Sequence, residues 1–327
     1  MRPSHVEGIA KIVAAENRIK RSDFSEILDS TDLDMSKVIL TSSIALAVSI
    51  PVLMVYTNST LMKHPWAYRL LWSIAFFTNL VTVQLPGRLD GELSNDGKGK
   101  QKLRFDTLFA PAGYAFAIWA VIYLGEMLLS TVVAINGKPV DVIRKATPWW
   151  ATANLMQSLW CASFRPRFIN MLWLPSIMLS FGAVALLGAH NEFSFELQGM
   201  EWGWEKFILM LMRAPISLHA GWLCAASILN VNGWLAASKF SMSTQLSFCI
   251  FSVYAAFLVG AIFSFRTGDP LIALTIAWAL RAIAANTAPK DPRSKEIQKP
   301  EVPVIVREAL ATTEWCLAIA LIVISII

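Results

Sequence analysis

The stretch FDTLFAPAGYAFAIWAVIYLGE, residues 105–126, decides the fold class of this 327-residue chain. A short polar approach is followed by Pro111 and a long apolar run, in which Glu126 is the fully charged side chain. About 20 apolar residues cross a bilayer as a helix. Proline suits the first turn of a helix, because its missing N–H would have no partner there. The stretch therefore predicts a membrane-spanning helix that begins at Pro111 and covers residues 111–134.

The composition of the whole chain agrees with a membrane protein. Hydrophobic residues make up 55% of the chain and charged residues only 16%, whereas soluble domains carry about 25% charged residues. A transmembrane β-barrel needs alternating segments of about ten residues, and these apolar runs are longer and do not alternate. The basic residues are spread over loops between the runs, which is typical of membrane topology rather than of nucleic-acid binding. We predict an all-α, polytopic protein whose partner is the lipid bilayer and not nucleic acid.

About nine transmembrane helices are predicted, preceded by a soluble or surface-lying arm at residues 1–37. The predicted spans are residues 38–56, 67–85, 111–134, 148–164, 169–189, 205–236, 245–264, 269–286 and 305–327. In this arrangement most loop Lys and Arg residues fall on the side of the N-terminus. The positive-inside rule then places the N-terminus on the inside face of an unidentified membrane.

Three motifs occur in a fixed order along the chain: LPGRLDGELS, LFAPAGYAFAIWAVIYLGE and RAPISLHAGWLCAASILN. Together they resemble the TspO/translocator protein family of tryptophan-rich sensory proteins, in particular its longer bacterial-type branch, over about residues 69–284. It implies a five-helix core at residues 67–236 that binds tetrapyrroles or other lipophilic molecules. The first loop of the core, residues 85–108, would close its cavity. Residues 38–56 would then be an extra N-terminal helix, and residues 245–327 three additional helices.

Deep aromatic and polar side chains of the core are the candidate ligand contacts. Large flat rings can stack on a planar ligand, but they also pack between helices, and both interpretations stay open. The resemblance implies a porphyrin or haem as a candidate ligand, and no cofactor is certain. The predicted ligand-binding residues are Trp119, Tyr123, Gln157, Trp160, Arg213, His219, Trp222 and Asn230. Gln157 stands where the family usually has Asn.

Charged and histidine side chains inside the spans raise separate expectations. A charge at mid-bilayer costs at least about 2.5 kcal/mol, so it should find a partner within the bundle. We expect Glu126 and Arg213 to form an ion pair, with Arg213 also a candidate anchor for a ligand carboxylate. His219 is either an axial ligand of haem iron or a hydrogen-bonding partner of a neighbouring helix. His190 lies at a span end and is expected to face solvent.

Tryptophans near the span ends are expected to form interfacial belts, as in other membrane proteins. These residues are Trp66, Trp149, Trp150, Trp202, Trp204 and Trp315. The small residues Gly221 and Ala225 form a face of the kind that supports helix dimerisation, although such faces are generic.

No catalytic motif of the G-x-S-x-G, H-E-x-x-H or phosphate-loop type occurs, so we predict that the protein is not an enzyme. The four cysteines lie within apolar spans without metal-ligand spacing, so no metal site is predicted. The leading hypothesis is an integral membrane protein that binds a tetrapyrrole or another lipophilic small molecule, for sensing, carriage or transport. One alternative is a non-catalytic accessory or scaffold subunit of a larger membrane complex, and a second copy of the chain, as a homodimer, is a further candidate partner. The other is a secondary transporter, although the paired half-repeats common in such proteins are not visible.

Overall fold

The computed structural model describes residues 64–85, 88, 107–135, 141–287 and 302–326. The predictions for the arm at 1–37, for the helix at 38–56 and for most of the loop at 85–108 lie outside these residues. The described part is all helical, with eight α-helices and two 3-10 segments. The all-α class is therefore confirmed. The predicted total of nine helices is not supported, because eight are found and the first predicted span is not described.

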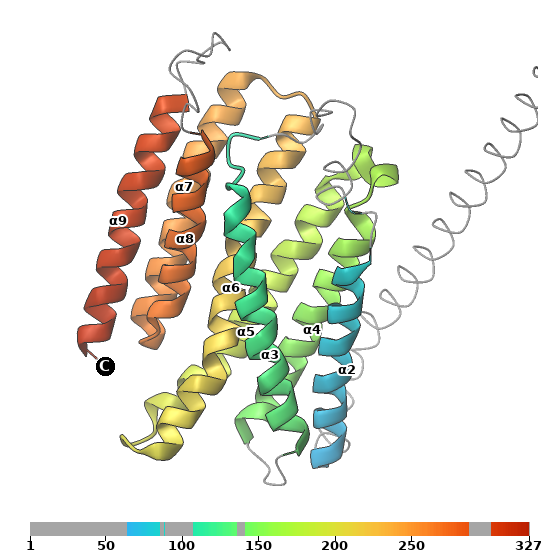
Figure 1. The fold of residues 1–327 in the computed structure, drawn as a ribbon, viewed down its shortest axis with the longest axis vertical. Helices are drawn as coiled ribbons and strands as arrows, with labels where there is room; N and C mark the ends of the chain where they lie inside the picture. Colours follow the sequence, from blue (N-terminus) through green and yellow to red (C-terminus); the bar gives the residue numbers. More distant parts are fainter. Residues whose placement is uncertain (1–63, 86–87, 89–106, 136–140, 288–301, 327) are drawn as a thin grey trace, which may run out of the picture.

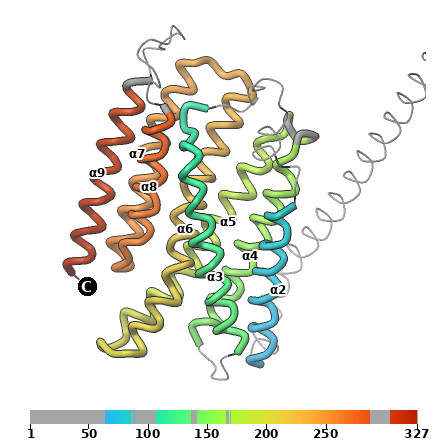
Figure 2. Tube along the Cα trace, viewed as in Figure 1, coloured from blue at the N-terminus to red at the C-terminus, as the bar shows by residue number. Residues whose placement is uncertain are grey.

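The helices run side by side along the long axis of the molecule, with α2 and α4 at one side and α9 at the other (Figure 1). Their bounds are α2 (Pro65–Gln84), η3 (Gly113–Ala117), α3 (Ile118–Ile135), α4 (Asp141–Ser163), η4 (Pro166–Met171), α5 (Trp173–Gln198), α6 (Trp204–Ala237), α7 (Met242–Thr267), α8 (Pro270–Thr287) and α9 (Val302–Ile326). The trace in Figure 2 shows α7 and α8 lying between α9 and the bundle formed by α2 to α6. Neighbours in space include α4 with α5, α5 with α6, and α6 with α8.

Five helical segments are long and apolar enough to cross a membrane by length and composition. They are Gly113–Ile135, Trp173–Gln198, Trp204–Ala237, Met242–Thr267 and Val304–Ile326. Because an apolar segment of this length spans the hydrocarbon core of a bilayer, the fold is that of an integral, multi-pass membrane protein.

Two helices extend well beyond the apolar runs that predicted them. α4 begins at Asp141 rather than at residue 148, and α5 continues to Gln198 rather than ending at 189. The added turn of α4 is polar: Asp141 lies 2.6 Å from the guanidinium of Arg144 and 2.8 Å from the ammonium of Lys145. Residues three and four apart face each other on a helix, so these pairs suit the first turn. Apolar length alone underestimates a helix whose end is polar.

The helix after Pro111 begins later than predicted, because α8 holds its approach in an extended conformation. The backbone N–H of Ala112 donates to the carbonyl of Ala282 at 2.9 Å. The amide Nδ2 of Asn286 donates to the carbonyl of Ala110 at 3.0 Å. These bonds to α8 use backbone groups on both sides of Pro111, and only then does η3 begin.

α8 also packs closely against α6 and η3. A Cβ atom on Gly221 would lie 2.8 Å from the Cβ of Thr275, so the approach of α8 requires glycine at this position. Trp278 Nε1 donates to the carbonyl of Ala115 at 3.0 Å, which ties α8 to η3. The small-residue face around Gly221 is thus occupied by α8 of the same chain rather than left open for a second copy.

Two of the tryptophans expected at the membrane interface are neighbours on α4 but occupy different environments. Trp150 is fully buried, and its ring stacks on Trp72 at 4.5 Å with an interplanar angle of 9°. Trp149 is exposed. Successive residues on an α-helix point about 100° apart, so only one of the pair can face the core. The interfacial prediction is wrong for Trp150, whereas Trp66, Trp202, Trp204 and Trp315 are exposed.

Candidate ligand-binding site

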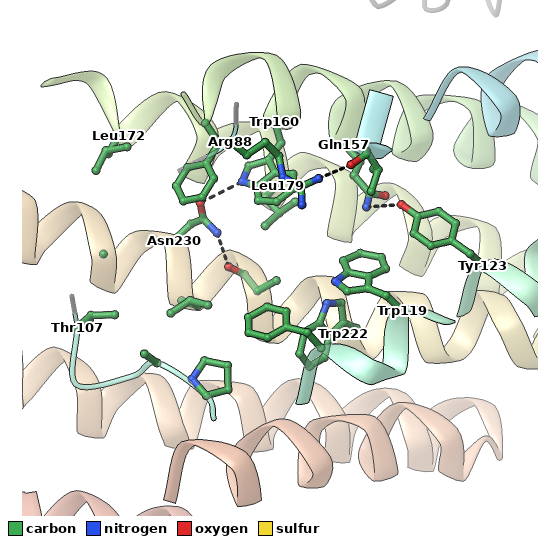
Figure 3. A pocket seen from close by; sticks show the side chains of 18 of the residues that line it. Arg88, Thr107, Trp119, Tyr123, Gln157, Trp160, Leu172, Leu179, Trp222 and Asn230 are labelled. Carbon is green, nitrogen blue, oxygen red and sulfur yellow. Dashed lines mark hydrogen bonds between the residues drawn. The ribbon is translucent and has the colours of Figure 1, made fainter. Parts of the chain in front are cut away.

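A cavity of about 580 Å³ lies inside the bundle, beside the segment that leads into η3. Its volume falls within the range of about 300–1,000 Å³ that is typical of small-molecule sites. The close-up in Figure 3 shows Trp119 and Trp222 near each other, and Trp160 beside Asn230. The aromatic residues of its wall are Phe116, Trp119, Tyr123, Trp160, Phe164, Trp222 and Trp234.

The aromatic wall is held in place by contacts between its own rings. Trp119 and Tyr123, one turn apart on α3, stack with ring centroids 5.3 Å apart. Trp222 of α6 meets Trp119 edge to face at 6.1 Å, and Phe116 meets Trp222 in the same way at 5.7 Å. Such offset and edge-to-face arrangements are the favoured geometries of aromatic pairs. The rings of α3 and α6 therefore form a preorganised wall that could accept a flat apolar molecule.

The polar group nearest Trp160 is the side-chain amide of Asn230. Trp160 Nε1 donates to Asn230 Oδ1 at 3.1 Å, which connects α4 with α6 across the cavity wall. Asn230 Nδ2 in turn donates to the backbone carbonyl of Ala226 at 2.9 Å. This amide is oriented by a backbone group, and its oxygen satisfies the indole N–H.

A second group of side-chain amides consists of Gln157, which lines the cavity, and of Asn79 and Asn154, which do not. Gln157 Nε2 donates to the hydroxyl of Tyr123 at 3.1 Å, and both residues line the cavity (Figure 3). Behind them, Asn79 Nδ2 donates to Gln157 Oε1 and to Asn154 Oδ1, each at 2.9 Å. Sequence reasoning missed Asn79 and Asn154, although an amide within an apolar span is a signal of internal hydrogen bonding.

Arg88 is a cation of the cavity wall that sequence reasoning also missed. Its guanidinium carbon lies 5.4 Å from the centroid of the Trp160 ring, within the range of a cation–π contact. Its Nη1 donates to the carbonyl of Val83 at 2.8 Å. The signal was present in the sequence, because Arg88 belongs to the LPGRLDGELS motif that carries the family resemblance.

The predicted ion pair between Glu126 and Arg213 is wrong, because each residue has another partner. Glu126 Oε1 lies 2.6 Å from His219 Nδ1, and both side chains are buried. His219 lies six residues beyond Arg213 on α6, roughly 9 Å along the helix axis at 1.5 Å per residue. The expectation that a charge at this depth finds a partner inside the bundle holds, but the level at which α3 meets α6 selects His219.

Arg213 pairs instead with Asp269, in the turn between α7 and α8. Arg213 Nε lies 3.0 Å from Asp269 Oδ2, and Arg213 Nη1 donates to Ser194 Oγ at 3.2 Å and to the carbonyl of Thr267 at 3.4 Å. Arg213 is absent from the cavity wall formed by the described residues. The structure thus gives it no position from which to anchor a ligand in this cavity.

His190 is also buried rather than facing solvent, because α5 extends beyond the predicted span end. Its Nε2 lies 3.0 Å from Asp269 Oδ2, and the hydroxyl of Ser217 donates to the same oxygen. Burial by itself would raise the pKa of Asp269. The hydrogen bond from His190, the charge of Arg213 and the hydrogen bond from Ser217 outweigh it and lower the pKa to about 2. The carboxylate at this turn is therefore ionised at neutral pH.

The local sequence explains why Asp269 occupies this position. Gly268 ends α7 in the left-handed conformation with φ of 63°, which glycine adopts without steric cost. Asp269 Oδ1 then accepts the N–H of Leu271 at 2.9 Å, and Pro270 is the first residue of α8. The tetrapeptide Thr-Gly-Asp-Pro is thus a helix stop followed by an N-cap, a signal that sequence reasoning did not use.

His219 lies behind the cavity wall rather than in it. Its ring meets Trp119 edge to face at 5.4 Å, while its Nδ1 faces Glu126. Haem ligation by His219 therefore receives no support from its position. Among the described residues, no group of three or more His, Cys, Asp or Glu side chains is arranged to hold a metal ion.

The predicted site residues accordingly fall into two sets. The structure brings together at the cavity Trp119, Tyr123, Gln157, Trp160, Trp222 and Asn230, and leaves Arg213 and His219 outside its wall. A bundle of membrane-spanning helices around an aromatic cavity defines the class: an integral, multi-pass membrane protein with an internal cavity. More particularly, the chain belongs to the TSPO-like protein family, whose model matches residues 66–327. No curated protein and no solved structure matches the chain.

Proposed function

We propose that this protein binds a lipophilic, largely planar small molecule, with tetrapyrroles as the leading class, in the cavity between α3, α4 and α6. The observation that carries the proposal is the aromatic wall of a cavity of about 580 Å³. Stacked and edge-to-face rings present flat apolar surfaces at fixed angles, and a planar ligand can lie against them. A role in sensing, carriage or transport would follow from such binding.

The polar residues of the wall support a ligand that also carries a polar edge. Arg88, Gln157 and Asn230 line the same cavity as the rings. Small-molecule sites combine mostly apolar walls with a few placed polar groups that set the orientation of the ligand. A porphyrin, with an apolar macrocycle and acidic side chains, has both features, and Arg88 replaces Arg213 as the proposed cationic contact.

Quenching of tryptophan fluorescence tests the proposal. Purified protein in detergent is titrated with protoporphyrin IX, and the wild type is compared with Trp222→Ala. The matched control is Trp315→Ala, which removes an exposed tryptophan of α9 outside the cavity. Saturable quenching that weakens at least tenfold in Trp222→Ala and is unchanged in Trp315→Ala would support the site. Quenching that never saturates, or that is unchanged in both variants, would contradict the proposed binding site.

The same titration separates binding from the alternative functions. Porphyrin recovered with its absorption spectrum unchanged after incubation supports binding without turnover, whereas a new spectrum indicates catalysis. Failure of every lipophilic probe to saturate would leave the accessory or scaffold role, as a homodimer or in a membrane complex, as the better proposal. Accumulation of ligand against a gradient in proteoliposomes would favour the transporter. The N-terminus is proposed to lie on the inside face, which labelling of introduced cysteines in intact membranes tests.

A further inference from the structure

We propose that the cavity selects ligands that carry a hydrogen-bond acceptor, and that Asn79, which does not touch the cavity, sets this selectivity. The inference rests on the proposed function, because it assumes that the cavity is a binding site. Its physical basis is a row of three buried side-chain amides between α2 and α4, those of Asn154, Asn79 and Gln157. One backbone carbonyl fixes which end of the first amide donates, and this in turn fixes the orientation of the other two. At the end of the row stands the hydroxyl group of Tyr123.

The fixed point is the backbone carbonyl of Trp150. A carbonyl oxygen can only accept, and it lies 2.9 Å from one end of the Asn154 side chain. That end must therefore be the NH₂ group, because a side-chain amide has one donor end and one acceptor end. The Oδ1 atom of Asn154 is then the end that faces α2.

The orientation of Asn154 determines the orientation of Asn79, which then determines that of Gln157. The group of Asn79 that meets Asn154 Oδ1 at 2.9 Å must be a donor, so it is Nδ2. The same Nδ2 has a second hydrogen, which reaches Gln157 Oε1 at 2.9 Å. With its oxygen engaged in this way, Gln157 presents its own NH₂ group to the Tyr123 hydroxyl at 3.1 Å. All three amide side chains are fully buried, so bulk water does not compete for these bonds.

The consequence is that the Tyr123 oxygen accepts a hydrogen bond, and its own proton remains to be donated. Within the described part of the chain, no acceptor receives that proton. Tyr123 lines the cavity, and its ring is held by stacking on Trp119. A ligand that carries a carbonyl, a carboxylate or a ring nitrogen near Tyr123 would supply the missing acceptor, whereas a pure hydrocarbon would leave the donor unpaired.

An unpaired oxygen on Asn79 supports the view that this polarity is enforced rather than incidental. Asn79 Oδ1 is buried and has no hydrogen-bond partner among the described residues. Turning this amide over would place its oxygen against the oxygens of Asn154 and Gln157, so the orientation cannot relax. Asn230 differs, because its oxygen takes the indole proton of Trp160 and ends that hydrogen-bonded path within the protein. Asn230 keeps one amide hydrogen besides the one it gives to Ala226, but it orders no hydroxyl proton, whereas the row behind Tyr123 does.

The test compares two planar probes that differ in a single group: 9-fluorenone, which has a carbonyl oxygen, and fluorene, which has a methylene group there. Both are measured by equilibrium dialysis against full-length protein in nanodiscs, with empty nanodiscs to subtract partition into lipid. The variants are Tyr123→Phe, Asn79→Leu and Trp222→Ala. The matched control is Asn232→Leu, which removes a buried amide that bonds to Ser252 outside the cavity.

We expect the ratio of fluorenone to fluorene affinity to fall roughly three- to tenfold in Tyr123→Phe, the range of a single neutral hydrogen bond. Asn79→Leu should lower the ratio as well, because it removes a donor that orients the Gln157 amide toward Tyr123. Fluorene binding should not weaken in either variant, and Asn232→Leu should leave the ratio unchanged. In infrared spectra, the carbonyl stretch of bound fluorenone should lie at lower frequency in the wild type than in Tyr123→Phe. A purely structural role for Asn79 would weaken both probes equally.

Three outcomes would overturn the inference, and they are distinguishable. If Trp222→Ala weakens both probes while the ratio is the same in every variant, the cavity binds ligands but does not select acceptors. If neither probe binds saturably, the proposed function fails and the selectivity fails with it. If Asn79→Leu does not fold, Tyr123→Phe and the infrared shift still decide whether the hydroxyl donates, and an unchanged carbonyl frequency would reject the proposal.

Discussion

The two buried polar clusters of this protein use similar groups but end in different ways. Around Asp269, the carboxylate receives Arg213, His190, Ser217 and the N–H of Leu271, so its lone pairs are filled from three helices. Between α2 and α4, the amide row ends at a tyrosine beside the cavity, where one donor is left over. We call the first cluster closed because its carboxylate finds all these partners within the protein, although His190 Nδ1 has none among the described residues. We call the second cluster open because it ends at the cavity.

This difference between the two clusters indicates that one mainly stabilises the fold and that the other mainly affects ligand binding. A closed cluster of ionised groups contributes to stability only while it is complete, because removing one member leaves a buried charge without its partner. An open cluster gives up part of its own hydrogen bonding, and a ligand can restore it. Substitutions around Asp269 should therefore change stability far more than binding, and substitutions in the amide row should change the preference among ligands.

The largest effect is expected when the closed cluster is broken at Arg213. Arg213→Leu would leave the carboxylate of Asp269 buried without its cation, and we expect a loss of about 3–5 kcal/mol in the free energy of unfolding. Reversible denaturation in mixed micelles measures it. Adding Asp269→Asn removes the uncompensated charge and should recover part of the loss. A loss below about 1 kcal/mol in the single variant would show that the cluster does not stabilise the fold.

The second effect concerns the Glu126–His219 pair, which joins α3 to α6 behind the cavity wall. Glu126→Leu and His219→Leu should each destabilise the protein, and their double-mutant cycle should show coupling of about 1–3 kcal/mol, because the side chains are in direct contact. The same unfolding assay supplies the four values. Strictly additive losses would mean that the two residues act independently and that their close approach carries no energy.

A smaller effect is expected at the contact between α8 and the approach to η3. Asn286→Leu removes the hydrogen bond to the carbonyl of Ala110, and we expect a loss of about 1 kcal/mol, the net value of one such bond. Because Ala110 and Pro111 line the cavity, porphyrin binding should also weaken by a fewfold factor in the quenching titration. Unchanged binding together with lower stability would assign α8 a purely structural role.

The smallest effect is expected at the exposed start of α4. Asp141→Asn removes the contacts with Arg144 and Lys145, whose side chains are well exposed. Solvent-exposed pairs contribute little, and many contribute nothing measurable. The melting temperature and the porphyrin affinity should both match the wild type. A clear loss of stability would show that this end of α4 is less accessible to water than its exposure indicates.

Much of the cavity wall could be expected from the sequence, because its residues lie within recognisable motifs. Trp119 and Tyr123 are one helical turn apart, so a shared direction follows from helix geometry alone. The resemblance placed Trp160, Trp222 and Asn230 in the same core, but the contacts of Trp222 with Trp119 and of Trp160 with Asn230 came only from the structure. Whether these residues bind a ligand stays a prediction.

The partners of the buried charges could not be predicted in the same way. Pairing Glu126 with Arg213 was reasonable from depth in the membrane, but the choice between Arg213 and His219 depends on how far one helix is shifted along another. Such a shift is set by side-chain packing over the whole contact between α3 and α6. Asp269 was overlooked because its role depends on four donors, which come from different helices and converge on its carboxylate only in the folded protein.

By itself, the sequence determined that this chain forms a bundle of membrane helices and that aromatic side chains would lie deep within it. Apolar length and helical spacing are local properties, so they can be read without knowledge of neighbours. Only the tertiary structure decided which buried groups meet, how α8 holds the approach to α3, and in which direction the amide row points. These outcomes depend on distances between separate helices, and hydrogen bonds form only where donor and acceptor approach to about 3 Å.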